Sequence, residues 1–526
     1  MIKHLLYTFF LFNFVYPSLA QQNNEIIYSK LLSPDTLMEH VWRLSSESME
    51  GRKTGTEGQR KAARYLAARL HQYGVSPLPG RDKLIQKHAL SLQFNSGKNI
   101  ELHQRFFLFL DDYIYVSGYN DTSLVLQNIV FAGYGIADSN YNDYKNLDVT
   151  GKAVLIYEGE PPSFKKNVNK KLHAAYSDWS TDWKKKLSVI YEKRPSVVFV
   201  ITEDIKALAD SLLDESKTIE FYRLASGPNS IPLIFISQEM ANSFFPEYAE
   251  RKFIKEKRRI DSKTKSSSFS ISTDAVINIS SRPSELMGEN VVGMIEGTDK
   301  KEEYVFISAH LDHLGILNSR FFPGADDNAS GSAAVLELAR IFAMAAKQTG
   351  KLKRSVVFAF FSGEENGLLG SSYFVNNSPV PLQQIVANLN IDMLGRRDSI
   401  YESQDSIDYV YLIGAKKTSN ELYQLNEISN NHGPKLKLDY LYDKPDDPNR
   451  FFERSDHYHF AEKNIPVIFY FSGMHADYHK PSDTPDKIKP NLLCKRTELI
   501  FLTTWKLADM NFRIKHNRKH VDPIEN

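Results

Sequence analysis

The sequence predicts an α/β protein: a mixed, mostly parallel sheet flanked by helices, with a β-rich module inserted into the chain. Apolar runs at 304–309, 357–361 and 466–471 each end at polar residues, which is typical of buried parallel strands. Residues 333–342 carry apolar side chains at helical spacing, as expected for a helix that packs on such a sheet. Between residues 120 and 268, short strand patterns alternate with polar loops, which indicates the inserted module.

Length and composition narrow the class of protein. A chain of 526 residues is too long for one ordinary hydrophobic core, so two domains are expected. The net charge of +1 favours neither nucleic acid nor an anionic membrane as a partner. Aromatic residues make up 12% of the chain, and this content excludes a largely disordered protein.

The first residues have the pattern of a secretory signal peptide. A short basic start at Lys3 precedes the apolar stretch 5–15 and a small-residue cleavage site at 18–20. We therefore expect residues 1–20 to be removed and the protein to be exported, either to a periplasm or out of the cell. The alternative is an uncleaved anchor, but the apolar stretch is short for a membrane span, and no later stretch is expected to cross a membrane.

Residues 35–74 are predicted to be largely helical. The segment Thr56 to Gln59 has the spacing of a capping box, in which the two side chains bond each other's backbone. An apolar stripe of helical period follows, and Gly74 suits the position just after a helix.

The inserted module is predicted from strands at 125–131, 151–157, 196–201 and 231–237. Nothing in it has the spacing of metal ligands. The basic tract 251–259 is expected to be a solvated helix face rather than an anion site. The single cysteine, Cys494, lies in an apolar run, and we expect it to pack within a helix.

Acidic and imidazole side chains gather where the later apolar runs end. His310, Glu364, Glu365 and Asp392 follow such runs, and ligands of open α/β sheets bind outside the carboxyl ends of the strands. A single acidic pair after a strand is usually part of a solvated turn. Solvated turns do not explain acidic and imidazole residues that recur after several successive strands. Imidazole and carboxylate donors suit zinc and similar divalent ions. With Asp327 and His479 the set has enough ligands for two metals, if Asp327 bridges them.

The two neighbouring glutamates are expected to differ in role. Adjacent residues at the end of a strand cannot both face the same way, so one can bind metal while the other acts as a general base. Residue order alone leaves open which one does which.

The segments around these residues resemble peptidase family M28, a family of zinc aminopeptidases with a paired zinc site, and the resemblance implies its exopeptidase fold. It implies that His310 and Asp392 hold one zinc ion and that Glu365 and His479 hold the other, bridged by Asp327. Glu364 would be the general base, and Asp312 would orient His310. Tyr478 matches a position where some members place a phenol that stabilises the oxyanion, although a packing role is the alternative.

The resemblance also implies a division of the chain. Residues 21–119 would begin the peptidase domain, 120–268 would be an insert similar to a protease-associated domain, and 269–515 would be the catalytic domain, followed by a polar tail at 516–526. The insert would form one wall of the cleft or gate substrates. The segment 49–58 resembles the start of family members and is given no catalytic role.

The implied function is a zinc-dependent aminopeptidase that hydrolyses N-terminal residues from peptides, with two zinc ions per chain. One rival is a glutamate-releasing carboxypeptidase, for which Arg396, Arg397 or Arg450 could bind a terminal carboxylate. The others are a glutaminyl cyclase-like transferase with one zinc ion and a non-catalytic receptor-like ectodomain. His313, His457 and His459 are expected to support neighbouring residues rather than bind metal. Oligomeric state and residue preference stay open.

Overall fold

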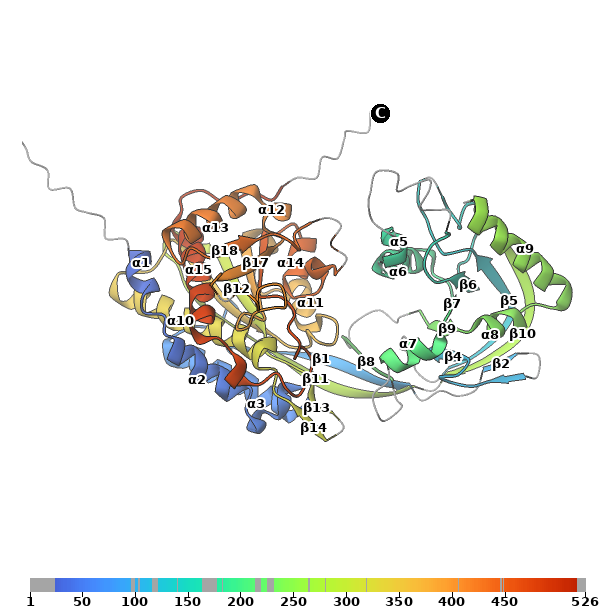
Figure 1. The fold of residues 1–526 in the computed structure, drawn as a ribbon, viewed down its shortest axis with the longest axis horizontal. Helices are drawn as coiled ribbons and strands as arrows, with labels where there is room; N and C mark the ends of the chain where they lie inside the picture. The colour runs from blue at the N-terminus through green and yellow to red at the C-terminus, as the bar shows by residue number, and fades with distance from the viewer. Residues whose placement is uncertain are drawn as a thin grey trace, which may run out of the picture.

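The computed structural model describes residues 24–517, apart from 96–99, 103–104, 116–121, 140, 163–176, 182, 213–218, 225–230, 264, 280, 318, 405, 445–446 and 448. The predicted signal peptide, and the tail from residue 518 on, lie outside the described residues. Figure 1 shows two bodies, each built around its own sheet and joined by long strands.

The larger body contains a nine-stranded mixed sheet, which confirms the predicted α/β class. Its four central strands run parallel, and the strand next to them on either side is antiparallel to the central strand that it pairs with. In sheet order the strands are β18 (Lys437–Asp439), β17 (Tyr409–Ile413), β19 (Val467–Phe471), β16 (Ile385–Asp392), β12 (Lys300–His310), β15 (Arg354–Phe361), β11 (Ser281–Ile295), β1 (Ile85–Asn95) and β8 (Ile219–Leu224).

Helices cover both faces of this sheet, and the central strands are therefore buried on both sides. Along β12, Val305 and Ile307 belong to one core, and Tyr304 and Phe306 belong to the other, as the two-residue period of a strand requires. The first core takes α1 (Asn24–Ser29), α2 (Pro34–Leu44), α3 (Glu57–Tyr73), α10 (Gly331–Gln348), α13 (Asn420–His432) and α15 (Pro490–Asp509). The second takes α11 (Leu369–Asn376) and α14 (His457–Glu462).

The predicted N-terminal helical segment divides into α2, a short turn η1 (Glu47–Arg52) and α3. Gly74 ends α3 in the left-handed conformation, as expected. The predicted capping box is wrong in detail. The Thr56 side chain makes no capping bond and donates instead to the Lys53 carbonyl, and the Gln59 side chain accepts from the Gly55 N–H.

The helix α10, with the turn before it, is long and apolar enough by composition to span a membrane, contrary to the expectation that no later stretch is. In the structure, 83% of its most apolar window is buried inside the protein, where it packs between the sheet and neighbouring helices. This is the environment of a core helix.

The smaller body contains an eight-stranded sheet with a hydrophobic core of its own. Its helices are α5 (Asp178–Thr181), α6 (Trp183–Lys193), α7 (Ile205–Leu212), α8 (Gln238–Ser243) and α9 (Glu247–Lys263). Its strands, in sheet order, are β3 (Arg105–Phe107), β2 (Ile100–Leu102), β10 (Ser268–Ile279), β5 (Thr122–Ala132), β6 (Ala153–Tyr157), β7 (Val197–Ile201), β9 (Leu233–Ile236) and β4 (Tyr113–Tyr115).

The sheet of the smaller body starts before and ends after the predicted insert of 120–268. Strands β2, β3 and β4 have three residues each, too few to show a period in the sequence, and β10 continues to Ile279. The domain boundaries stay a prediction. The strands of the smaller sheet favour limits of the insert near residues 96 and 280 instead of 120 and 268.

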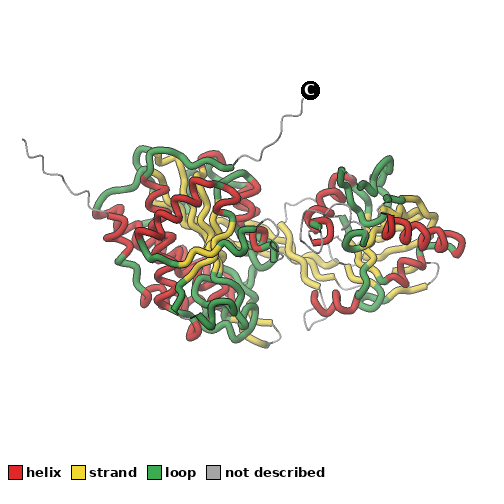
Figure 2. Tube along the Cα trace, turned by 45° about the horizontal axis from the view of Figure 1, so that its top comes forward, coloured by secondary structure: helices red, strands yellow, loops and turns green. Residues whose placement is uncertain are grey.

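Two long strands join the bodies. β1 leads out of the larger body and β11 leads back into it, paired antiparallel from Ile85 opposite Val291 to Asn95 opposite Ser281. Figure 2 shows these strands running between the two sheets. β8 belongs to the part of the chain between them, yet it pairs with β1 at the edge of the larger sheet. The smaller body is therefore inserted at the end of one hairpin.

Candidate metal centre

Neighbouring strands of the larger sheet bring the predicted residues to one edge. His310 is the last residue of β12, Asp392 is the last residue of β16, and Glu364 and Glu365 follow β15. These strands are adjacent and parallel, in the order β16, β12, β15. Their carboxyl ends therefore meet at one rim, as the sequence argument expects.

His310 lies at the middle of the group and is 1% exposed. Its Nε2 is 3.1 Å from Asp392 Oδ1 and 3.3 Å from Asp327 Oδ1. Its other ring nitrogen, Nδ1, lies 3.2 Å from the backbone carbonyl oxygen of Asp312. That carbonyl can fix the tautomer so that Nε2 faces the carboxylates.

The Asp312 carboxylate lies 3.9 Å from His310 Nδ1, farther than the backbone carbonyl of the same residue. It accepts hydrogen bonds from Thr54 Oγ1 at 2.8 Å and from the backbone N–H of Glu364 at 3.3 Å. The side chain therefore holds the loop that carries the two glutamates, and the backbone of Asp312 makes the contact that was expected from its carboxylate.

Asp327 reaches the rim from η2 (Ala325–Ser330), the turn before α10. The buried Asp483 carboxylate accepts hydrogen bonds from the backbone N–H groups of Asp326 and Asp327, which fixes the turn. Asn328 bonds across to the carbonyl of Ile391 next to Asp392. Asp327 thus faces both His310 on one side and His479 on the other.

His479 and His313 complete the group. Nε2 of His479 lies 3.1 Å from Asp327 Oδ2 and 3.0 Å from Glu365 Oε2, without hydrogen-bond geometry to either. His313 Nδ1 lies 2.7 Å from Glu365 Oε1. Two imidazoles therefore hold Glu365, and the second carboxylate oxygen of Glu365 points to the side that His479 occupies.

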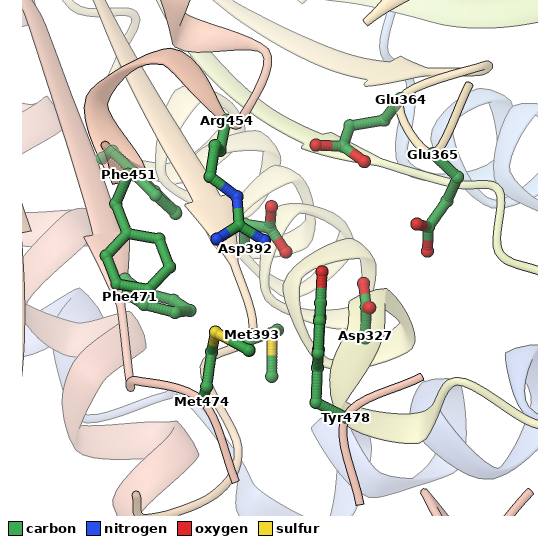
Figure 3. Close-up of a pocket in the computed structure, with 11 residues that line it drawn as sticks. Asp327, Glu364, Glu365, Asp392, Met393, Phe451, Arg454, Phe471, Met474 and Tyr478 are labelled. Atoms are coloured by element: carbon green, nitrogen blue, oxygen red, sulfur yellow. The ribbon is translucent and has the colours of Figure 1, made fainter. Parts of the chain in front are cut away.

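The donor set fits a divalent cation. Ligand atoms of His310, Glu364 and Asp392 all lie within 4.8 Å of one another, and so do those of His310, Asp327 and Glu365. Nε2 of His479 is buried and aimed at two carboxylates to which it makes no hydrogen bond. Imidazole nitrogen and carboxylate oxygen are the donors that zinc accepts in catalytic sites. Figure 3 shows the four carboxylates turned toward a common space.

The charges of the group drive the pKa values apart. Burial and the neighbouring carboxylates hold the pKa of Glu364 well above its usual range. Burial and the charge of Asp327 also raise the pKa of Glu365, but the contacts with His313 and His479 outweigh them and lower it to about 2. Burial would lower the pKa of His479, and the adjacent carboxylates of Asp327 and Glu365 raise it to about 10 instead. Glu364 is therefore the glutamate of the pair that holds a proton most readily.

A cavity of about 350 Å³, partly open to solvent, lies against the group. Tyr478 lines it, stacked on His479 with ring centroids 3.8 Å apart. Burial and the negative charges of Asp327 and Glu365 raise the pKa of Tyr478, so its hydroxyl stays protonated. The remaining lining is apolar except for the carboxylates and one arginine: Met393, Phe451, Arg454, Phe469, Phe471 and Met474.

Other residues that the sequence singled out lie away from this group. His457 is buried and stacks on Phe469, and His459 pairs with Glu462 at 2.9 Å. Each of the three arginines considered for a carboxylate site has an acidic partner of its own. Arg396 pairs with Asp477, Arg397 with Asp408, and Arg450 with Glu453.

Sequence reasoning missed four residues that act at this rim. Arg52 binds the backbone of the rim loops, Asp483 fixes the turn of Asp327, and Ser455 donates to Asp392 Oδ2 at 2.8 Å. Arg454 lines the cavity. Arg52 lies in the segment 49–58 noted above, but neither spacing nor periodicity identifies a residue that acts through tertiary contacts.

Known proteins match this chain mainly in the part that carries the candidate metal centre. Residues 290–504 match the sequence model of peptidase family M28. A curated relative, probable leucine aminopeptidase 2 of Arthroderma benhamiae, is 29% identical over 224 residues, which are 41% of this chain and 39% of that protein. Aminopeptidase YwaD of Bacillus subtilis is 26% identical over 245 residues, 44% of this chain and 48% of that protein. The matched segment spans less than half of each relative.

The fold extends beyond that segment. A solved aminopeptidase from Aneurinibacillus sp. strain AM-1 has a TM-score of 0.53 to this chain at 17% identity, covering 95% of this chain and 98% of the other. This likeness shows a shared fold over both bodies. The segment that matches in sequence contains every residue of the candidate metal centre. The part of the chain that carries the candidate metal centre, residues 290–504, is thus similar in sequence to peptidase family M28.

Proposed function

We propose that this protein is an exported, zinc-dependent aminopeptidase that removes N-terminal residues from peptides and uses two zinc ions per chain. The observation that carries the proposal is the gathering of His310, Asp327, Glu365, Asp392 and His479 beside a cavity that is partly open to solvent. Export is supported by the signal-like pattern of residues 1–20.

The two ions would share one bridging carboxylate. Asp327 is suited to the bridge because its two oxygens face different imidazoles, Oδ1 toward His310 and Oδ2 toward His479. His310 and Asp392 would hold one ion, and Glu365 and His479 would hold the other. His313, in contact with the free side of Glu365, would orient that ligand rather than bind metal.

When bound, the zinc ions polarise the scissile carbonyl and make water a better nucleophile. Glu364 is suited to take the proton of the attacking water and to deliver it to the leaving amine, because its raised pKa allows both steps. Tyr478 keeps its proton and lines the cavity, so its hydroxyl can donate to the oxyanion. The free α-amino group of the substrate would be held by a carboxylate or a metal ion.

One observation favours a second candidate, the carboxypeptidase. Arg454 lines the cavity, where a guanidinium group could bind a terminal carboxylate. The glutaminyl cyclase-like alternative needs only one zinc ion, and the complete set of five ligands speaks against it. A receptor-like ectodomain would not require Glu364 to be poised beside those ligands.

The proposal is tested on the mature protein, residues 21–526, loaded with zinc. One peptide is supplied in unblocked, N-acetylated and C-amidated forms, and mass spectrometry follows both ends over time with and without a zinc chelator. Stepwise loss from the free N-terminus, blocked by acetylation and by chelator, is the expected result. Loss from the C-terminus would move the assignment to the carboxypeptidase. No trimming of any form by the zinc-loaded protein would contradict both.

A further inference from the structure

We propose that Arg454 binds a carboxylate group of the substrate inside the cavity and thereby sets substrate preference. The proposal rests on the peptidase function above and concerns the part of the site that chooses the peptide. Arg454 follows a short 3-10 turn, η4 (Phe451–Glu453), and its backbone N–H bonds the Phe451 carbonyl at 3.1 Å. The turn thus places Arg454 in the same cavity as the carboxylates, more than 60 residues after Asp392 in the chain.

The position of the side chain points to a ligand in the cavity. Figure 3 shows the guanidinium group reaching into the cavity between Asp392 and the rings of Phe451 and Phe471. The guanidinium carbon lies 5.1 Å from the centroid of the Phe451 ring, which supports the group from one side. Of the described residues that line the cavity, Arg454 is the one with a cationic side chain.

Arg454 also differs from the three arginines considered above for a carboxylate site. Arg396, Arg397 and Arg450 each have a carboxylate within 4.0 Å. Within the described part of the chain, the structure gives Arg454 no such partner, even though Asp392 and Glu364 line the same cavity. A guanidinium presents several donors in one plane and binds a carboxylate through two of them, so this side chain is equipped for an anionic group that enters with the substrate.

The rest of the lining indicates what that substrate carries. Phe451, Phe469 and Phe471 are at most 5% exposed and form an apolar floor with Met393. Behind the floor, the hydroxyl of Tyr411 donates to the buried Asp398 at 2.8 Å, so the floor is anchored. A ligand that fits has a hydrocarbon part on the rings and a carboxylate at the guanidinium.

Two parts of a peptide offer this chemistry. One is the side chain of an N-terminal glutamate or aspartate. The other is the terminal carboxylate of a dipeptide, which lies close to the scissile bond. In the first case an N-terminal lysine or arginine is disfavoured, because its charge would be brought next to Arg454. Both carboxylates would bind the same guanidinium group, and two matched pairs of substrates distinguish between them.

The experiment compares kcat/KM on two pairs of substrates, using the zinc-loaded mature protein. Glu-Ala-Ala-amide and Gln-Ala-Ala-amide differ only in the side-chain carboxylate. Leu-Ala and Leu-Ala-amide differ only in the terminal carboxylate. We expect one of the two ratios to be tenfold or more in the wild type and to fall to near one in Arg454→Met. Arg454→Lys should keep part of that ratio, since it retains the charge but not the paired donors.

Charge reversal and a neighbouring arginine serve as controls. Arg454→Glu should shift preference toward Lys-Ala-Ala-amide over Glu-Ala-Ala-amide if the side-chain carboxylate is bound, and toward Leu-Ala-amide over Leu-Ala if the terminal carboxylate is bound. Arg450→Met removes an arginine of the same segment that pairs with Glu453, and it should leave both ratios unchanged. Ratios that are equal in the wild type and in Arg454→Met would overturn the role of Arg454 while leaving the peptidase proposal intact.

The two proposals can also fail separately. If the zinc-loaded wild type trims no peptide, the peptidase proposal fails, and calorimetry then tests Arg454 alone with two matched pairs: L-glutamate α-amide with L-glutamine α-amide, and L-leucine with L-leucinamide. Tighter binding of the carboxylate-bearing member of either pair that is lost in Arg454→Met supports the carboxylate contact. Equal binding within both pairs by the wild type overturns it.

Discussion

Arg52 Nη2 donates a hydrogen bond to the backbone carbonyl of Gly324 at 2.9 Å, three residues before Asp327. The same guanidinium donates to the carbonyls of Leu311 and Pro323, at 2.9 and 2.8 Å. Leu311 follows His310 directly, so one buried side chain holds both loops that carry these metal-site residues. The N-terminal segment is therefore part of the support of the site, although it supplies none of its ligands.

Replacing Arg52 by methionine should both destabilise the larger body and weaken metal binding. The substitution leaves several buried carbonyl groups without a donor, each costing about 1–3 kcal/mol. We expect the unfolding free energy in urea to fall by about 3 kcal/mol or more and the zinc content to fall with it. Arg64→Met is the matched control, because Arg64 is 57% exposed and pairs with Glu57 at the surface. Equal loss in both variants would refute the support role.

Glu364→Gln should separate metal binding from turnover. The amide keeps the size of the side chain but cannot accept the proton of water, so kcat should fall by about 10²–10⁴. Zinc content, measured by mass spectrometry of the metal, should stay at the wild-type value. Glu365→Gln is the contrasting variant, because His313 and His479 both contact this carboxylate, and it should lose zinc. A Glu364→Gln enzyme of near-normal activity would exclude Glu364 as the base.

Asp327→Ala should reduce zinc binding more than loss of either terminal ligand. In the proposed arrangement the bridging carboxylate would serve both ions, whereas His479 would serve one. We expect two zinc ions per chain in the wild type, about one in His479→Ala and fewer in Asp327→Ala, each after equilibrium dialysis against the same free zinc concentration. A wild type that saturates at one ion would favour the single-zinc transferase alternative.

The sequence predicts the rim of the sheet well because strand ends are visible in it. His310, Asp392 and the two glutamates each follow a mostly apolar run, and parallel strands must bring such residues together. The central strands and their flanking helices follow from the same periodicity. What spacing cannot reveal is contact between distant segments, and Arg52, Asp483 and Arg454 act through such contacts.

The remaining differences between the predicted and the observed elements arise where the local sequence pattern is weak. The three-residue strands β2 to β4 are too short for an alternating pattern, so the smaller sheet begins earlier than expected. The spacing of Thr56 and Gln59 fits a capping box, but the tight turn before α3 gives Thr56 a nearer acceptor in Lys53. The apolar helix α10 shows that composition alone cannot separate a core helix from a membrane span.

Protonation of the buried His40 should make the larger body less stable in mild acid. His40 is 1% exposed, and burial, together with the charges of Arg69 and Arg340, lowers its pKa to about 4. The native state thus binds fewer protons than the unfolded state between pH 6.5 and 4, so the stabilising contribution is complete above pH 6.5 and is lost as pH falls.

The expected size of this effect is roughly 2–3 kcal/mol at pH 4.5. It is measured as the difference between wild type and His40→Gln in the free energy of urea unfolding, at pH 7.5 and pH 4.5. The variant should lose less stability on acidification than the wild type. His432→Gln, at the exposed end of α13, is the control and should behave as the wild type. The same acid loss in all three proteins would show that His40 is not the titrating group.

The smaller body can be removed at one place because of the register of its connecting strands. Asn95 lies opposite Ser281 in the antiparallel pair of β1 and β11, so an Asn-Gly turn can replace residues 96–280 and close a hairpin. The described lining of the cavity runs from Asp327 to Tyr478 and belongs wholly to the larger body. The smaller body also has a separate hydrophobic core.

The shortened protein should therefore keep kcat/KM on dipeptide substrates within about threefold, while its preference for short over long peptides changes. Removing β8 uncovers the edge of β1 from Leu90 to Asn95, so the comparison is made at low protein concentration, with zinc content and monomer state checked first. Unchanged length preference in a folded, zinc-loaded protein would dismiss the gating role of the insert. Complete loss of dipeptide activity in the same protein would instead show that the smaller body completes the site, since the cavity alone would not suffice for turnover.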